Sequence, residues 1–423
     1  MRCPLKCRHP IIALVLFACA VPLRGEPNLL ATYNGKYSRQ SRFERAVKEV
    51  GAAYDERLKV VQEKLGLAPA AGKAIQVVLR DAQAADPTKY APVTDAPFQT
   101  RWQNGQVQIV LHTEFIINGR YDVKQSLTHE LAHAVVRTHM TPDAYESVPT
   151  WLREGLSVWC ADEIAQKVAV LYRDSTTPVD AQIKGVADTV NAESFARYAE
   201  YGLTFEWIVK QKGEPAVRAL VAAVVAGVNA QEAVRQVTGQ PWEDFVSTAK
   251  VYATSRVREL QPPGATEFKS ICMHDQSRNH AAVIENGAQF LKKYRDSRLS
   301  GNVLYYMVKA YRSQRNLAAA NSTMRTLEEK HAHDCSLMDE AAYQIGAAHA
   351  EAKQWRPAIR VFEELLRDQP DSNLQDRALY YLALCHARSG NKKKAKEYVE
   401  IFDRSFPKSQ MSDEMATLRR ELP

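Results

Sequence analysis

Apolar residues recur at helical spacing over most of this chain, and strand-like runs are confined to its first third. The segment 40–66 carries apolar residues three and four positions apart and ends at Gly66, which predicts an amphipathic helix. Residues 74–80 (AIQVVLR) predict a strand, and residues 106–112 (QVQIVLH) alternate apolar and polar side chains, which predicts a half-exposed strand. After a turn at Asn118-Gly119, we expect helices near 124–139, 150–172, 192–212, 214–226, 229–238 and 241–259.

The helical pattern is interrupted at Pro262-Pro263-Gly264, which predicts a domain boundary between residues 40–261 and residues 265–423. Beyond it the sequence repeats itself. Ala320, Ala358 and Ala395 recur at spacings of 38 and 37 residues, between paired amphipathic segments. Such a period predicts an all-α solenoid, in which a small residue lets two helices cross closely. Residues 266–411 resemble tetratricopeptide repeats (TPR), and an irregular helical bundle is the alternative.

The N-terminus has the pattern of a targeting segment. Arg2, Lys6 and Arg8 precede an apolar run of ten residues, Ile11–Ala20, which ends in small residues suited to cleavage. We therefore expect a signal peptide over residues 1–20, a linker over residues 21–39, and an exported protein, periplasmic or secreted. An uncleaved anchor is an alternative, and so is a lipoprotein attached through Cys19. No later stretch is long enough to span a membrane.

Composition indicates a globular protein, and the net charge does not point to a polyanionic partner. The chain has 423 residues, of which 45% are hydrophobic and 25% charged, so we expect two or three globular domains. Removing the three positive charges of the signal peptide from the net charge of +7 leaves +4. This modest excess does not indicate a nucleic-acid partner. Outside the signal peptide the cysteines are Cys160, Cys272, Cys335 and Cys385; a Cys272–Cys335 disulfide and buried free thiols are both open.

The candidate metal-binding and catalytic residues lie in the segment His129-Glu130-Leu131-Ala132-His133. On a helix, residues four apart project from one face, so His129 and His133 can bind one metal ion. Glu130 is offset by about 100° and lies near the ion without binding it. It can take a proton from a water on the ion and pass it to a leaving amine. This HExxH pattern is suggestive by itself, since chance also produces it.

A catalytic zinc ion needs a third protein ligand, for which there are two candidates. His139 has the spacing of a third histidine, but Val136 stands where a helix-ending glycine would be required. On a continuing helix His139 would lie about 240° around from His133 and point away. Glu154 is the favoured candidate, because Pro149-Thr150 predicts a second helix that can run antiparallel to the first.

The pair HELAH and PTWLREGL (residues 149–156) resembles the gluzincin metallopeptidases of the peptidase MA-like group, which are related to thermolysin. The resemblance covers about residues 40–255. It implies an α+β zincin-like domain with a small mixed sheet, one Zn²⁺ ion, and Glu154 as the third ligand. The sequence departs from thermolysin at Val158, where an Asp would orient the first histidine. That partner must come from elsewhere, such as a backbone carbonyl.

The resemblance also implies two further elements of the site. An edge strand, for which residues 106–112 are the candidate, would pair with extended substrate. A Tyr or His from the helical part would stabilise the oxyanion, and Tyr198 and Tyr201 are the candidates, of which only one can face the cleft.

These observations predict an exported zinc metallopeptidase in which Glu130 activates a zinc-bound water and the TPR-like domain docks a protein partner or a substrate. The first alternative is an exported adaptor with a structural or vestigial zinc site. Glu130 argues against it, because a structural site needs no base. The second alternative is a zinc hydrolase acting on non-peptide amides, which the fold does not exclude.

Overall fold

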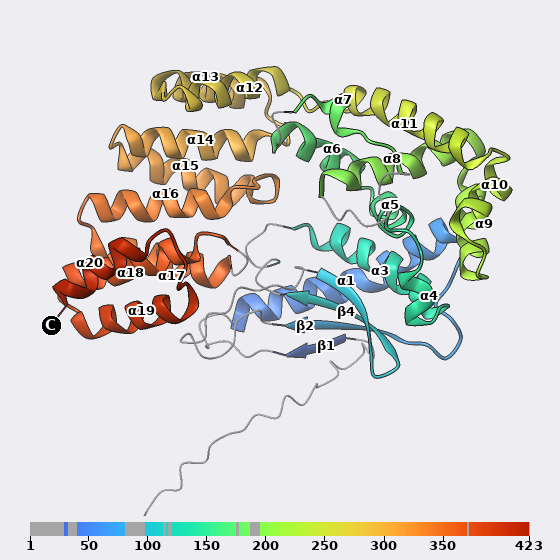
Figure 1. Cartoon of the computed structure of the whole chain (residues 1–423), viewed down its shortest axis with the longest axis horizontal. Coiled ribbons are helices and arrows are strands. Elements are labelled where there is room, and N and C mark those ends of the chain that lie inside the picture. Colours follow the sequence, from blue (N-terminus) through green and yellow to red (C-terminus); the bar gives the residue numbers. More distant parts are fainter. Residues whose placement is uncertain are drawn as a thin grey trace, which may run out of the picture.

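A computed structural model describes residues 29–32, 40–80, 98–112, 116, 121–174, 177–186, 195–369 and 372–422. The expected signal peptide lies outside these residues. The chain forms a small sheet covered by helices, followed by a stack of paired helices that curves alongside it (Figure 1). Both parts of the predicted fold class, an α+β domain and a helical repeat region, are therefore present.

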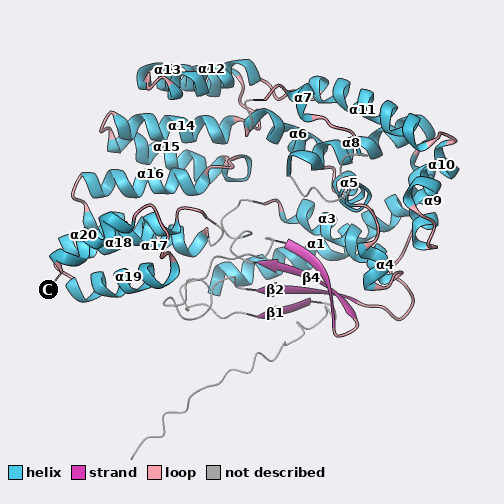
Figure 2. Cartoon of the chain, viewed as in Figure 1, coloured by secondary structure: helices cyan, strands magenta, loops and turns pink. Residues whose placement is uncertain are grey.

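Within the described residues the sheet has four strands and is mixed (Figure 2). They are β1 (Leu29–Thr32), β2 (Ile75–Arg80), β3 (Phe98–Gln103) and β4 (Gln106–His112), in the spatial order β1-β2-β4-β3. β1, β2 and β4 are parallel, whereas β3 is antiparallel to β4. Asn104 and Gly105 join β3 to β4 with φ of 51° and 75°, as a tight hairpin turn requires.

Two expectations about the sheet are wrong. Residues 29–32, assigned to a linker, form strand β1, which is too short to stand out by its pattern. Residues 106–112 are not the sheet edge, because β4 pairs with β2 on one side and with β3 on the other. The edge next to the helices of the site is β3, whose sequence FQTRWQ alternates Phe98, Thr100 and Trp102 with polar residues but was not predicted as a strand.

The helices of the N-terminal part pack on the sheet and on one another. α1 (Gln40–Leu65) lies beside α3 (Val123–Thr138), which packs on the sheet. The others are α4 (Pro142–Glu146), α5 (Thr150–Cys160), α6 (Ile164–Arg173), α7 (Val179–Gln182), α8 (Phe195–Lys212), α9 (Glu214–Val225), α10 (Ala230–Thr238) and α11 (Trp242–Glu259).

The helix expected over residues 150–172 is two helices. α5 ends at Cys160 and α6 begins at Ile164, with Asp162 at a φ of 55° between them. The Lys64 ammonium, from α1, donates to the backbone oxygens of Trp159 and Cys160 at 3.1 Å and so caps the end of α5. Because Lys64 is almost 100 positions earlier in the chain, no local pattern predicts this break.

The C-terminal helices stack in pairs, as the repeat predicted. They are α12 (Ala265–Gln276), α13 (His280–Lys293), α14 (Ser300–Ser313), α15 (Leu317–Lys330), α16 (Met338–Glu351), α17 (Trp355–Asp368), α18 (Gln375–Arg388), α19 (Lys392–Ser405) and α20 (Ser412–Glu421). Ala320, Ala358 and Ala395 are fully buried at the helix crossings. The repeat also appears in the backbone, because Arg278, Arg315, Lys353 and Gly390 all have positive φ in the turn within a pair.

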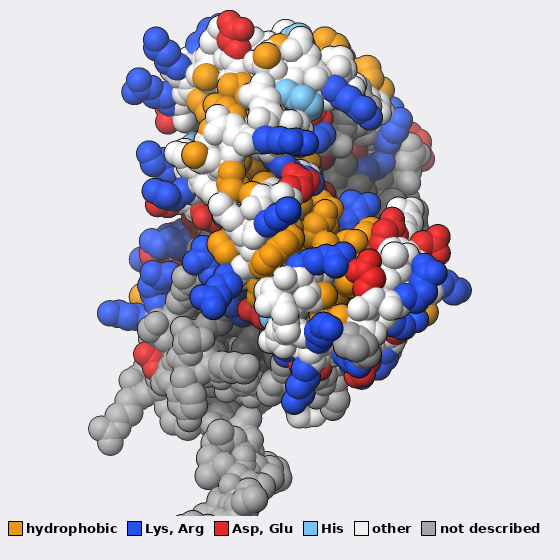
Figure 3. All heavy atoms as spheres, turned by 90° about the vertical axis from the view of Figure 1, so that its left-hand side faces the viewer, with side chains coloured by type: hydrophobic (Ala, Val, Ile, Leu, Met, Phe, Trp, Pro, Cys, Tyr) orange, Lys and Arg blue, Asp and Glu red, His pale blue; other side chains and the backbone are white. Residues whose placement is uncertain are grey.

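The turns within the pairs lie on the side of the solenoid away from the sheet, at the left of Figure 1. Figure 3 views this side, where Lys and Arg side chains flank a band of hydrophobic ones. The turns between pairs point the other way. There the backbone oxygen of Asp334 accepts a hydrogen bond from Arg173 at 3.2 Å, and Ser336 donates to Asp174 at 2.9 Å. The solenoid is thereby joined to α6.

A continuous hydrophobic core crosses the expected domain boundary. Val168 of α6, Leu203 of α8 and Val257 of α11 belong to the same buried cluster as Phe268 and Val303 of the solenoid. Cys160, Cys272, Cys335 and Cys385 are all free thiols, so the Cys272–Cys335 disulfide is not formed. Among the described helices, none combines the length and the apolar character needed to cross a bilayer.

Candidate metal centre

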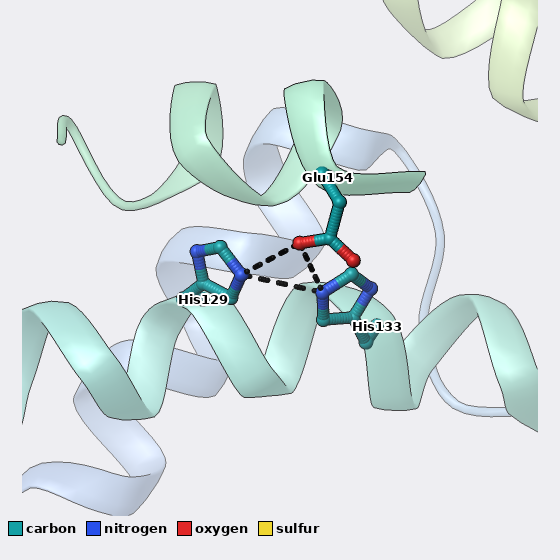
Figure 4. Close-up of side chains that lie close together, drawn as sticks. All are labelled: His129, His133 and Glu154. Carbon is teal, nitrogen blue, oxygen red and sulfur yellow. Dashed lines mark hydrogen bonds and ion pairs between the residues drawn. The ribbon is translucent and has the colours of Figure 1, made fainter. Parts of the chain in front are cut away.

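Helix α3 carries the two histidines on the face opposite its buried stripe. Asp122 caps its start by accepting a hydrogen bond from the Gln125 amide at 2.8 Å. Leu127, Leu131 and Val135 are among its residues fully buried in the core. This packing fixes the rotation of the helix, so that His129 and His133, four residues apart, point away from the core into the space below α5 (Figure 4).

Helix α5 brings Glu154 over the histidines. Trp151, in its first turn, packs among Phe205, Trp242 and Phe245, with ring centroids 5.9–6.1 Å apart. Gly155 faces α8 so closely that a Cβ there would lie 2.6 Å from the backbone oxygen of Tyr201. Trp151 and Gly155 therefore fix how closely α5 packs against its neighbouring helices, and so where Glu154 lies relative to the histidines.

The three side chains converge on one point. The Nε2 atoms of His129 and His133 lie 3.3 Å apart, and a carboxylate oxygen of Glu154 lies 3.4 Å and 3.5 Å from them. All three side chains are largely buried, with 10–18% of their surface exposed. Among the described residues, they are the single group of three or more such side chains that could hold a metal ion.

The donor set and its dimensions fit a zinc ion. A tetrahedral ion with bonds of about 2.0–2.1 Å needs its ligand atoms roughly 3.3–3.4 Å apart, close to the separations found. Two imidazoles and one carboxylate form the ligand set of catalytic rather than structural zinc sites, because three protein ligands leave a fourth position open. His129, His133 and Glu154 are therefore arranged as the predicted ligands.

The second nitrogen of each imidazole has its own partner. His129 Nδ1 lies 3.1 Å from the Glu163 carboxylate, and His133 Nδ1 lies 2.7 Å from the Tyr145 hydroxyl. A carboxylate only accepts hydrogen bonds at neutral pH, so His129 donates from Nδ1, which leaves Nε2 as the atom that would bind a metal once it has lost its proton. Neither partner was predicted from the sequence.

The carboxylates give the site a negative character. Burial disfavours the charged form of His129, but Glu163 and Glu154 outweigh burial and raise the pKa of His129 to about 10. Burial opposes ionisation of Glu163 too, yet His129 and Lys167 lower the pKa of Glu163 to about 2. For Glu154, His133 and His129 overcome burial and hold the pKa well below its ordinary value. Both carboxylates are ionised at neutral pH, as metal binding requires.

Glu163 takes the place of the Asp that the sequence lacks at Val158. Val158 cannot face the histidine, because its side chain packs into α8, where a Cβ on Gly202 would lie 2.5 Å away. On an unbroken helix Glu163 would lie about 180° around from Glu154 and point away from the site. The break at Asp162 turns the chain back, so that Glu163 reaches His129.

Glu130 lies on the wall beside the metal site and is held by the sheet. Its carboxylate accepts a hydrogen bond from the Thr100 hydroxyl at 2.7 Å, and its side chain is almost buried. Thr100 belongs to the edge strand β3, so the candidate base and the candidate substrate strand are in direct contact.

A cleft of about 360 Å³ surrounds these residues. Tyr198 lines it, and the Lys167 ammonium lies 5.7 Å from the Tyr198 ring. Tyr201 is fully buried in the core, so it is not placed to act on a substrate. His139, the alternative third ligand, ends α3 and donates from Nε2 to the backbone oxygen of Ala68 at 2.7 Å.

Comparison with models of protein families finds two matches along the chain. Residues 102–250, from the sheet edge to α11, match the model of the Peptidase MA superfamily. The chain carries a peptidase MA domain. Tetratricopeptide repeats follow it, matched at residues 340–372 and 377–409. No curated protein and no solved structure matches the chain significantly. The resemblance to the gluzincin group and to TPR is confirmed. The region matched to the Peptidase MA superfamily contains His129, His133 and Glu154.

Proposed function

We propose that this protein is an exported zinc metallopeptidase that hydrolyses peptide bonds. The observation that carries the proposal is the convergence of His129, His133 and Glu154 beside Glu130 in one cleft. Two imidazoles and a carboxylate would hold the ion. When bound, zinc supplies Lewis-acid chemistry, polarising a carbonyl and making water acidic near neutral pH.

Strand β3 is the proposed platform for the substrate. Phe98, Gln99 and Thr100 line the cleft, and β3 pairs with β4 on one side but with no described strand on the other. An extended peptide can add to such an edge through main-chain hydrogen bonds, which hold the peptide whatever its side chains. The scissile bond would then lie between β3 and the histidines of α3.

We assign proton transfer to Glu130 and stabilisation of the oxyanion to Tyr198. The Glu130 carboxylate takes a proton from the attacking water and returns it to the leaving amine. The Thr100 hydroxyl orients this carboxylate. Tyr198 lines the same cleft, and its hydroxyl would donate a hydrogen bond to the developing oxyanion.

The repeat domain is proposed to dock a partner or a substrate protein. Solenoids of this kind present extended surfaces for protein binding. The hydrogen bonds of Arg173 and Asp174 to the solenoid tie it to α6, the helix that follows Glu163. A protein docked there would therefore be held near the cleft. Export rests on the N-terminal pattern of residues 1–20.

The test is to incubate the mature protein with a diverse peptide library and to sequence the new ends. A Glu130→Gln variant and a chelated sample are run in parallel, and zinc content is measured for each. We expect cleavage by the zinc-loaded wild type only, with zinc retained in Glu130→Gln. Cleavage by Glu130→Gln, or loss of its zinc, would contradict the assigned role. Bound zinc without cleavage by the wild type would favour the adaptor.

A further inference from the structure

Two arginines lie at the end of the cleft beyond His133. Arg137 is one helical turn after His133 on α3, and Arg153 immediately precedes Glu154 on α5. Both line the cleft, and only 13% and 16% of their side-chain surfaces are exposed. We call these two residues the arginine pair.

The arginine pair shares a single carboxylate. Glu146 of α4 lies 2.9 Å from Arg137 and 2.6 Å from Arg153, and it is itself 55% exposed. Two guanidinium groups and one carboxylate leave one positive charge in excess. By contrast, the other cation at the opposite end of the cleft, Lys167, is matched by Glu163 at 3.2 Å.

The arginine pair also has unused hydrogen-bonding capacity. Each guanidinium carries five N–H groups in a planar fork. Glu146 accepts from one terminal nitrogen of each arginine, and Thr150 lies 3.5 Å from a second terminal nitrogen of Arg153. A carboxylate bound between the forks would accept hydrogen bonds from N–H groups that these contacts leave over.

The position of the guanidinium groups is fixed before any ligand arrives. Arg137 stacks on the Tyr145 ring at 4.0 Å and Arg153 lies 5.4 Å from the same ring. The hydroxyl of that Tyr contacts His133, so the arginine pair and the metal ligands are built on one rigid support. A group bound by the arginine pair would thus be held at a set distance from the reacting bond.

We propose that the arginine pair is a subsite that binds one carboxylate of the peptide substrate and so makes the enzyme prefer peptides that carry it at the matching position. The inference rests on the proposed peptidase function. The carboxylate can belong to an acidic side chain or to the C-terminus of the peptide. Both present the same planar, anionic group to the forks of Arg137 and Arg153.

The test measures binding rather than cleavage, using the zinc-loaded full chain with Glu130→Gln. The probes are fluorescein-labelled, alanine-based octapeptides in which one Glu is moved through the sequence. Each is matched by a Gln counterpart and by a C-terminal amide. We expect the best carboxylate-bearing peptide to bind on the order of 10- to 100-fold more tightly than its neutral match. Whether the Gln or the amide exchange removes the preference identifies the source of the carboxylate.

The variants separate a ligand-binding role from a structural one. Arg137→Gln and Arg153→Gln should each weaken binding of the acidic peptide about tenfold and leave the neutral peptide unchanged, a loss of about 1.4 kcal/mol. Glu146→Gln should act in the opposite direction, because it removes the competing carboxylate and keeps a hydrogen-bond acceptor. Arg218→Gln, which makes the same charge change on the exposed surface of α9, is the control.

Equal affinity for acidic and neutral peptides, absence of any peptide binding, or a preference that survives in both arginine variants would overturn the subsite. If the wild type cleaves the carboxylate-bearing peptides and both their Gln and amide counterparts equally well, the subsite fails and the peptidase function stands. If acidic peptides bind but none is cleaved, the peptidase function fails and the subsite stands.

Discussion

The carboxylate of Glu163 lies 3.1 Å from the Nδ1 atom of His129, although Glu163 immediately precedes α6, His129 is on α3, and the two residues are 34 positions apart. Metal-binding histidines are commonly oriented by such a partner, whose removal weakens metal binding 10- to 100-fold. In this chain the partner follows a helix break instead of standing on the ligand helix. The metal affinity of the site therefore depends on the break that ends α5, because this break brings Glu163 to His129.

Replacing Glu163 should weaken zinc binding with little change in fold. For Glu163→Gln we expect a zinc affinity about tenfold lower, since the amide can still accept a hydrogen bond but has no charge. The measurement is competition with a chromophoric chelator. Glu206→Gln, which alters a carboxylate bonded to Tyr252 and Arg256 outside the cleft, should bind zinc as the wild type does.

Zinc binding should release a proton from His129 at neutral and mildly alkaline pH. Without metal, the pKa of His129 is raised from 6.5 to about 10, because Glu163 and Glu154 outweigh burial. The charged form therefore stabilises the metal-free fold fully below pH 6.5, and this contribution is lost as the pH rises through 10. Zinc binds only the neutral form of His129 and therefore competes with this proton. As a result, zinc affinity should rise about tenfold per pH unit as the pH increases toward 10.

Calorimetry of zinc binding at pH 8, in buffers of different ionisation enthalpy, counts the protons released. Glu163→Gln should release fewer, because the pKa of His129 falls when its charged neighbour is removed. Equal proton release by the wild type and Glu163→Gln would contradict the link between these residues.

Thr100 should affect turnover without affecting the metal. Its hydroxyl donates a hydrogen bond of 2.7 Å to the Glu130 carboxylate. We expect Thr100→Val to lower kcat about tenfold, roughly 1.4 kcal/mol, with KM and zinc content unchanged, and Thr100→Ser to retain activity. Thr204→Val removes a buried hydroxyl bonded to the Glu200 carbonyl and serves as the control. An equal kcat loss in Thr204→Val would point to a general effect of packing.

Gly155→Ala should destabilise the fold and displace Glu154. The added Cβ would meet the Tyr201 backbone, which cannot rotate away as a side chain can. We expect a loss of about 1–3 kcal/mol in the free energy of unfolding and weaker zinc binding. Gly202→Ala is the matched variant at the same helix crossing, where the Cβ would meet the side chain of Val158 instead. Denaturant unfolding of the chelated proteins, with zinc affinity measured in parallel, tests both, and a Gly155→Ala protein as stable as the wild type would contradict this account.

The sequence determined those features that rest on short-range periodicity. His129, Glu130 and His133 share a helix because of their spacing, and that helix is stable because its other face is apolar. The repeat of 37 and 38 residues likewise predicted the solenoid, since each pair of helices needs a small residue where it crosses. Glu154 followed from a resemblance, and the structure places it beside the two histidines.

Tertiary structure alone decided what depends on contacts between distant segments. Lys64 of α1 caps α5 and ends it, and only that break lets Glu163 reach His129. β3 became the sheet edge through pairing across the sheet, and it therefore holds Glu130 through Thr100. Tyr198 and Tyr201 are equivalent in local pattern, and packing between α5 and α8 buried one and left the other in the cleft. Such contacts join residues tens of positions apart, and a local pattern of side chains contains no information about them.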